Sequence, residues 1–185
     1  MNPPNTSREE IMRVSRKIVS EKGLPALNMR TLAKECGIAL GTLYNYYSDK
    51  DELVVAAIES VWQDILEKSA PDSGVRFSQF VTQTYAHIIE KLKDYPDFLA
   101  AHSISVAGSV KGKARGMMER CFGKIRSELH AALREDKNVD RSIFSETFRE
   151  EDLTEHILDT ITISIINGKP DCATLTEILD RLLYR

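Results

Sequence analysis

The run GIALGTLYNYYSDKDEL at residues 37–53 gathers uncharged side chains whose types and spacing suit contact with nucleic-acid bases. On a helix that turns about 100° per residue, Leu43 and Tyr47 point inward together. An asparagine amide can pair with adenine in a bidentate way, and threonine offers a hydroxyl and a methyl for thymine. A small, polar and aromatic outer face therefore predicts contact with base edges in the major groove. The outward positions are Gly41, Thr42, Asn45 and Tyr46.

Two short helices and a tight turn must hold that face in place. Asn28 can cap a helix that runs to about Cys36, and Gly37 can take the left-handed conformation that ends a helix. A further helix is expected over roughly 40–47. A longer helix from Ser7 to Gly23 would support the pair, with Glu10 completing a capping box. These elements together predict a helix-turn-helix.

The remaining pattern is helical throughout, so the expected fold class is all-α with about nine helices. A helix should open at Asp49 with Glu52 and reach about Ser69, before the loop at 71–74. We predict an N-terminal three-helix DNA-binding domain over 1–53, with the fourth helix leading on from residue 50. We predict a C-terminal helical bundle domain for ligand binding and dimerisation over 54–185. Further helices are expected near 77–92, 98–110, 117–133, 150–167 and 172–184.

Charge and composition limit the partners and the compartment. The net charge is −3, but residues 1–50 carry eight basic and five acidic side chains, whereas 51–185 carry seventeen and twenty-three. A mildly basic head on an acidic body suits a protein that presents one end to a polyanion. The longest apolar run, Leu53–Ile58, is far short of the roughly 20 residues that span a bilayer. With no signal-peptide pattern and three widely spaced cysteines, we expect a cytoplasmic protein without a membrane partner.

The segment 37–53 closely resembles the recognition region of TetR-family transcriptional regulators, in which Gly-Thr-Leu-Tyr and a lysine before an acidic pair recur. The resemblance is strong over about residues 7–55 and elsewhere concerns only length and helix count. Leu40 departs from a commonly polar or basic position, which affects the preferred operator sequence. Tyr46 replaces a common histidine and could reach a phosphate through its hydroxyl. The resemblance implies DNA contacts by Arg30, Leu40, Gly41, Thr42, Tyr44, Asn45, Tyr46 and Lys50.

The same resemblance implies a homodimer that senses a small molecule. The last two helical segments are apolar on more than one side, so one side can pack in the chain and another against a partner subunit. Methionine and aromatic side chains in the central helices suit an adaptable cavity, although such residues are more often core. The predicted dimer interface is Leu158, Ile161, Ile165, Leu175, Leu179 and Leu182. The predicted ligand pocket is Tyr85, His87, His102, Met117, Met118, Cys121 and Phe122.

The predicted function is a ligand-responsive repressor that binds a pseudo-palindromic operator as a dimer, although an activator fits the same residues. The alternative is a helical small-molecule-binding protein whose DNA-binding head is vestigial, against which Thr42, Asn45 and Lys50 speak. An enzyme is not expected, because no paired nucleophile and base, carboxylate cluster or phosphate-binding glycine loop occurs. The four histidines have no ligand-like spacing, so neither a metal nor a cofactor is expected.

Overall fold

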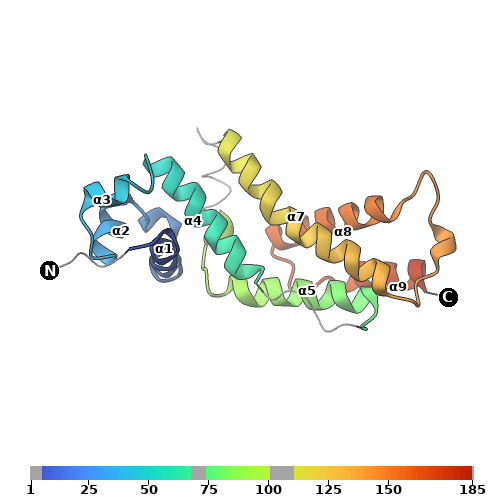
Figure 1. Ribbon diagram of the computed structural model, residues 1–185. Helices are drawn as coiled ribbons and strands as arrows, with labels where there is room; N and C mark the ends of the chain where they lie inside the picture. Colours follow the sequence, from blue (N-terminus) through green and yellow to red (C-terminus); the bar gives the residue numbers. More distant parts are fainter. Residues whose placement is uncertain (1–5, 68–73, 101–110, 185) are drawn as a thin grey trace. The chain divides into compact units, whose positions relative to one another are not determined.

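The computed structural model describes residues 6–67, 74–100 and 111–184, apart from the side chains of residues 111–115 and 118 (Figure 1). The described ranges contain α-helices, two short 3-10 helices and one isolated antiparallel bridge, Ser145 to Phe148. The prediction of an all-α fold is therefore confirmed. The α-helices are α1 Arg8–Lys22, α2 Met29–Glu35, α3 Leu40–Tyr44, α4 Lys50–Ile65, α5 Phe77–Leu92, α7 Lys111–Glu135, α8 Glu150–Ile166 and α9 Ala173–Leu183; the 3-10 helices are η1 Leu24–Ala26 and η2 Arg141–Ile143.

Side-chain caps begin the helices of the N-terminal region where the sequence predicts them. The Ser7 hydroxyl accepts a hydrogen bond from the Glu10 amide at 3.1 Å, and Asn28 accepts one from the Thr31 amide at 3.0 Å. At the start of α4, Asp49 accepts from the Glu52 amide at 2.7 Å. Each bond satisfies a backbone donor that the first helical turn leaves without an intrahelical partner, so the entry of each helix is fixed locally.

Two predicted boundaries differ from the structure, and a third is described only in part. The third helix ends at Tyr44 rather than near 47, because Asn45 and Tyr46 form a turn. The fourth helix ends at Ile65 rather than near Ser69. The expected helix over 98–110 is helical at 98–100, and its residues 101–110 lie outside the described ones. None of the described helices is both long enough and apolar enough to cross a membrane.

The chain divides into two compact units, Met1–Ile65 with Leu92–Glu119, and Leu66–Lys91 with Arg120–Arg185. In the first unit α1 buries Ile11, Ile18 and Val19. Between α1 and α4, Arg16 donates to the Ser60 hydroxyl at 2.5 Å. These contacts join α1 to α4 within one unit. The predicted boundary between the DNA-binding domain and the C-terminal domain, at residue 53, concerns function rather than packing and stays a prediction.

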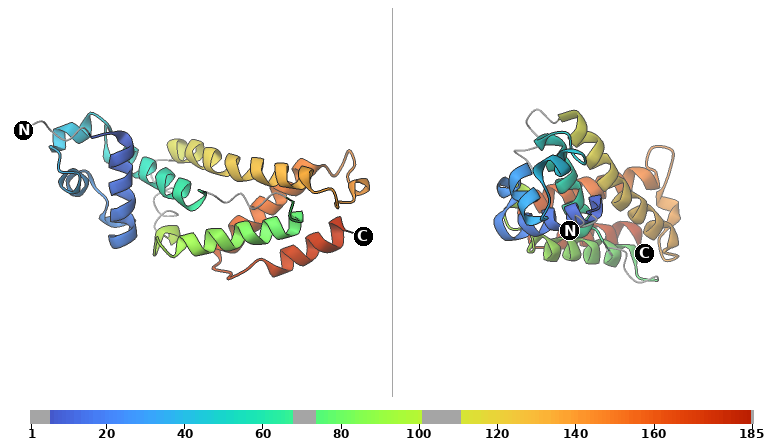
Figure 2. Two further views of the ribbon diagram at one scale, coloured as in Figure 1. Left: turned by 60° about the horizontal axis from the view of Figure 1, so that its bottom comes forward. Right: turned by 60° about the vertical axis from the view of Figure 1, so that its left-hand side comes forward.

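The second unit is a bundle of α5, α8, α9 and the later part of α7, and its views agree that α5 and α9 run side by side (Figure 2). Hydroxyl groups of Thr82 on α5 and Thr176 on α9 lie 2.8 Å apart. Buried Asp136 accepts from the Phe77 amide at 2.8 Å and from the Tyr184 hydroxyl at 2.6 Å. One carboxylate thus caps the start of α5 and fixes the residue that follows α9.

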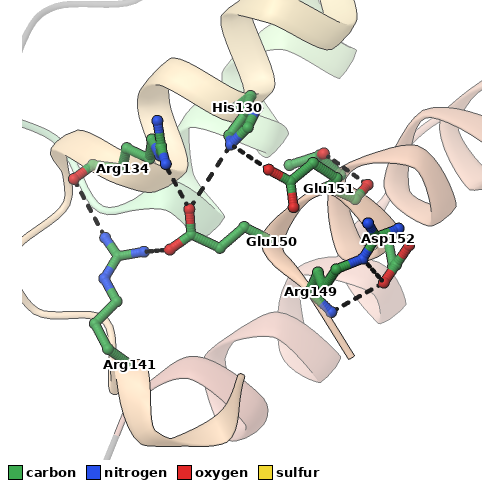
Figure 3. A network of polar contacts seen from close by, with 8 residues as sticks. His130, Arg134, Arg141, Arg149, Glu150, Glu151 and Asp152 are labelled. Carbon is green, nitrogen blue, oxygen red and sulfur yellow. Dashed lines mark hydrogen bonds and ion pairs between the residues drawn. The ribbon is translucent and has the colours of Figure 1, made fainter. Parts of the chain in front are cut away.

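An ion-pair cluster joins the end of α7 to the start of α8 (Figure 3). Glu150 accepts from Arg134 at 3.2 Å and from Arg141 at 2.7 Å, and His130 lies 3.7 Å from it. Arg141 also donates to the Leu133 carbonyl at 2.6 Å, which satisfies one of the free carbonyls at the end of α7. The cluster therefore sets the angle at which the chain turns from α7 into α8.

Candidate nucleic-acid interface

The turn between α2 and α3 is built from a single residue in the left-handed region. Gly37 has φ +68°, a conformation that glycine adopts without the cost of a side-chain clash. Its neighbour Ile38 donates its amide to the Ala33 carbonyl at 3.0 Å, and Gly37 donates to the Lys34 carbonyl at 3.1 Å. Both bonds close the end of α2 in the pattern typical of helix termination by glycine. The predicted helix-turn-helix is therefore present.

The inner side of the recognition helix, α3, is fully packed. Leu43 and Leu32 are 0% exposed, and Tyr47 is 2% exposed. Ala33 on α2 is also buried, which lets the two helices approach closely. Leu43 is therefore the inward residue of α3 itself, and Tyr47, which follows the turn after the helix, packs on the same inner side.

The outer face of α3 carries the residues predicted to read bases. Gly41, Thr42 and Asn45 are exposed, and Tyr44 is 49% exposed, unusually high for a large aromatic side chain. Among the described residues, neither the Thr42 hydroxyl nor the side-chain amide of Asn45 has a hydrogen-bond partner. Leu40 is half-buried at the start of the helix. The exposed polar groups can therefore bond an external ligand without breaking an internal contact.

Two exposed cations flank this face in the sequence. Arg30 lies on α2 and Lys50 is the first residue of α4. In the described ranges neither makes an ion pair, whereas Arg13 and Lys22 pair with Glu10 and Glu35. A cation without a carboxylate partner can neutralise a phosphate without first losing an internal bond.

Tyr46 does not fit the role that the sequence predicts for its hydroxyl. That hydroxyl donates to the backbone carbonyl of Thr6, just before α1, and Tyr46 is half-buried. Since the single hydroxyl hydrogen is used in this bond, it is not free to donate to a phosphate while the bond stands. The predicted phosphate contact through the Tyr46 hydroxyl is thus replaced by an internal contact.

The predicted ligand-pocket residues are placed as follows. Tyr85 is 1% exposed and donates its hydroxyl to the Lys169 carbonyl at 2.7 Å, so it ties α5 to the segment before α9. Met117 and Cys121 are buried, whereas His87 and Phe122 are half-buried. His102 and the side chain of Met118 lie outside the described residues. The pocket stays a prediction, and Tyr85 already has a structural role.

The predicted dimer-interface residues are mostly core of the single chain. Leu182 is 37% exposed, and the large exposed apolar residues of this region also include Ile163, Ile166 and Ile178, at 58%, 62% and 54%. A groove runs between α8 and α9, and its lining mixes apolar residues with hydroxyl-bearing ones and with His156, Lys169 and Asp171. The sequence pattern could not distinguish the apolar residues that pack inside the chain from those that stay on its surface. The buried residues are Leu158, Ile161, Ile165, Leu175 and Leu179.

Comparison with known proteins agrees with this geometry. Residues 11–57 match the sequence model described as bacterial regulatory proteins of the TetR family. An uncharacterized HTH-type transcriptional regulator of Haemophilus influenzae is 32% identical over 95 residues, which is half of this chain and half of that protein. The HTH-type regulator PksA of Bacillus subtilis is 31% identical over 61 residues, 33% of this chain and 30% of PksA. The match therefore spans at most half the length of these relatives.

Solved structures share the fold over nearly the whole chain. BioQ, crystallised with its double-stranded DNA operator, has a TM-score of 0.61 at 16% identity, covering 94% of this chain and 95% of BioQ. The multidrug binding protein EbrR complexed with proflavin has a TM-score of 0.61 at 17% identity, covering 95% and 98%. The fold and the α2–turn–α3 unit define an all-helical protein with an N-terminal helix-turn-helix. Over residues 11–57 the chain is similar to the TetR family of bacterial regulatory proteins, and its fold is the one seen in BioQ and EbrR.

Proposed function

We propose that this protein is a DNA-binding transcriptional regulator, most directly a ligand-responsive repressor that binds a pseudo-palindromic operator as a dimer. The observation that carries the proposal is the outer face of α3. Thr42 and Asn45 are exposed there, and the described part of the chain supplies no partner for either side chain. Their hydrogen-bonding groups match those of base edges in the major groove, which is wide enough to admit a helix.

In this proposal, different residues contact the DNA bases and the DNA phosphates. Thr42 and Asn45 read base edges, with Gly41 allowing the backbone of α3 to come close. Leu40 and Tyr44 add apolar contact, which suits a thymine methyl. Arg30 and Lys50 neutralise phosphates, a contribution that holds the protein on DNA without regard to sequence.

A second copy of the chain is the proposed occupant of the exposed apolar surface on α8 and α9. Ile163 and Ile166 lie one turn apart on α8, and Ile178 and Leu182 lie one turn apart on α9. Full burial of an exposed Ile or Leu contributes about 1.5–3 kcal/mol; these four are 37–62% exposed, so covering the rest of each would add about half of that. A dimer would also present two copies of α3 to half-sites about 34–36 Å apart, as a pseudo-palindrome requires.

A small-molecule effector would act by binding more tightly to a conformation with lower operator affinity. EbrR, which shares the fold, is a multidrug binding protein observed with proflavin, and this supports a ligand-binding role for the helical body. The predicted pocket residues are the candidates for that contact. A transcriptional regulator acts where the DNA is, so the proposal includes a cytoplasmic location. The proposed function requires neither an enzymatic step nor a cofactor.

Selection of bound sequences from random duplex DNA tests the DNA-binding proposal. The purified full chain is expected to enrich a palindrome, with an affinity that falls as salt concentration rises because counterions are released on binding. An enriched sequence without two-fold symmetry would contradict the dimeric reader. If no duplex shows salt-sensitive binding, the helical small-molecule-binding alternative replaces the proposal.

Sedimentation velocity tests the dimer separately. Ile166→Lys together with Ile178→Lys should shift the protein from dimer to monomer, because each change places a desolvated charge in the proposed interface. Gln83→Lys, which adds the same charge on the exposed side of α5, is the matched control and should stay dimeric. A monomeric wild-type protein, or a double variant that remains dimeric, would overturn this interface.

A further inference from the structure

The end of the recognition helix is held by the first turn of α1. Arg8 Nη2 donates a hydrogen bond to the backbone carbonyl of Tyr46 at 2.8 Å. The same guanidinium lies over the Tyr47 ring, with 5.2 Å between Cζ and the ring centroid. A third contact joins the same two segments, since the Tyr46 hydroxyl donates to the Thr6 carbonyl. Three contacts, spanning about forty residues of sequence, therefore converge at the exit from α3.

The chemistry of the Arg8 contacts suits this position. Carbonyl groups at the end of a helix carry partial negative charge and lack intrahelical donors, so a nearby cation is favourable. The Tyr47 ring is 2% exposed and anchored in the core of the head, which makes it a fixed platform for the guanidinium. Arginine meets both needs at once, because its planar guanidinium can stack on a ring while it donates in its own plane.

The carbonyl that Arg8 holds belongs to the residue directly after Asn45. A shift of the Tyr46 backbone would move the Asn45 amide, whose proposed pairing with a base tolerates little displacement. α3 is also short, with Asn45 and Tyr46 already in a turn, so few intrahelical bonds fix its end. The Tyr46 and Tyr47 amides donate to the Leu43 carbonyl at 3.0 and 3.1 Å. The Arg8 contact adds to these local bonds by holding the Tyr46 carbonyl.

We infer that Arg8 is a positioning residue for the recognition helix, acting through the Tyr46 carbonyl and the Tyr47 ring rather than through DNA. This inference rests on the proposed DNA-binding function. Its competitor is direct contact between Arg8 and a phosphate, since Arg8 is exposed. The two roles differ in salt dependence, because only a phosphate contact releases a counterion.

The experiment compares Arg8→Ala, Arg8→Lys and wild type in operator-binding titrations at several salt concentrations, using the palindrome selected above. Arg8→Ala should weaken binding on the order of tenfold while the slope of log affinity against log salt stays unchanged. Arg8→Lys should recover part of the loss, since an ammonium can still donate to the carbonyl and lie over the ring. Arg13→Ala, which removes an exposed α1 arginine paired with Glu10, is the matched control and should bind as wild type does.

If the slope of log affinity against log salt becomes shallower by about two in Arg8→Ala, each subunit of the dimer has lost one phosphate contact. That result would overturn the inference in favour of direct contact between Arg8 and DNA. Unchanged affinity would overturn it as well. Amide hydrogen exchange on the free protein gives an independent readout: the Tyr46 and Tyr47 amides should exchange faster in Arg8→Ala, while those of α1 keep their protection. If wild type binds no duplex, the proposed function fails, and the exchange result alone still decides whether Arg8 holds the end of α3.

Discussion

Replacing Gly41 by alanine separates the stability of the recognition helix from its approach to DNA. Gly41 lies in the first turn of α3, has no positive φ, and an added Cβ would meet nothing within 4 Å. Alanine should therefore stabilise the fold by about 0.5 kcal/mol through reduced backbone entropy of the unfolded chain, raising Tm by about 1–2 °C. The same Cβ would stand on the proposed DNA-facing surface, so operator affinity should fall.

Gly37→Ala is the contrasting variant. It also replaces glycine by alanine, but at a residue whose φ is positive. Gly37 also has open space around it, but its φ of +68° costs alanine about 1–2 kcal/mol, which lowers Tm by about 2–8 °C. Thermal melts followed by circular dichroism, with operator titrations on the same samples, measure both effects. If the Gly41→Ala protein is more stable but binds DNA as wild type does, Gly41 is not needed for close approach of α3 to DNA. If it is less stable than wild type, the placement of Gly41 in the first turn of α3 is refuted.

Three further outcomes follow from the geometry. Asn45→Ala should cost about 1–3 kcal/mol of binding and relax one base position in a repeated selection, whereas a uniform loss over all sequences would contradict base reading. Lys50→Ala should weaken all duplexes alike and reduce the salt slope by about one per head, with Lys17→Ala, paired with Glu21, as the control that leaves the slope intact. Burial alone would raise the pKa of Asp136, but hydrogen bonds led by that from Tyr184 hold it below its ordinary value. A lowered pKa stabilises the fold above the pKa of an unfolded aspartate, about 3.9, and this stability is lost as pH falls through the folded value. Asp136→Asn should therefore cost about 2 kcal/mol in urea unfolding at pH 7, with a gap to wild type that narrows below about pH 4.

The sequence by itself determined the elements whose signals are local. Asn28 and Asp49 cap the helices that follow them, and Gly37 ends α2, because a cap or a left-handed turn depends on residues within four positions. Helical periodicity likewise predicted that Leu43 and Tyr47 are buried, and both are, although Tyr47 lies beyond the end of α3 at Tyr44. Exposure of Thr42 and Asn45 follows directly from that.

Only the tertiary structure decided the contacts between segments distant in sequence. The Tyr46 hydroxyl is bonded to Thr6 and the Tyr46 carbonyl to Arg8, partners that no local pattern indicates. In the C-terminal helices, α8 and α9 carry apolar residues on more than one side. From the sequence, each such residue could pack either within the chain or against a partner subunit. Which side each helix buries depends on how the chain packs against itself, so Leu158 lies in the core while Ile163 is left on the surface.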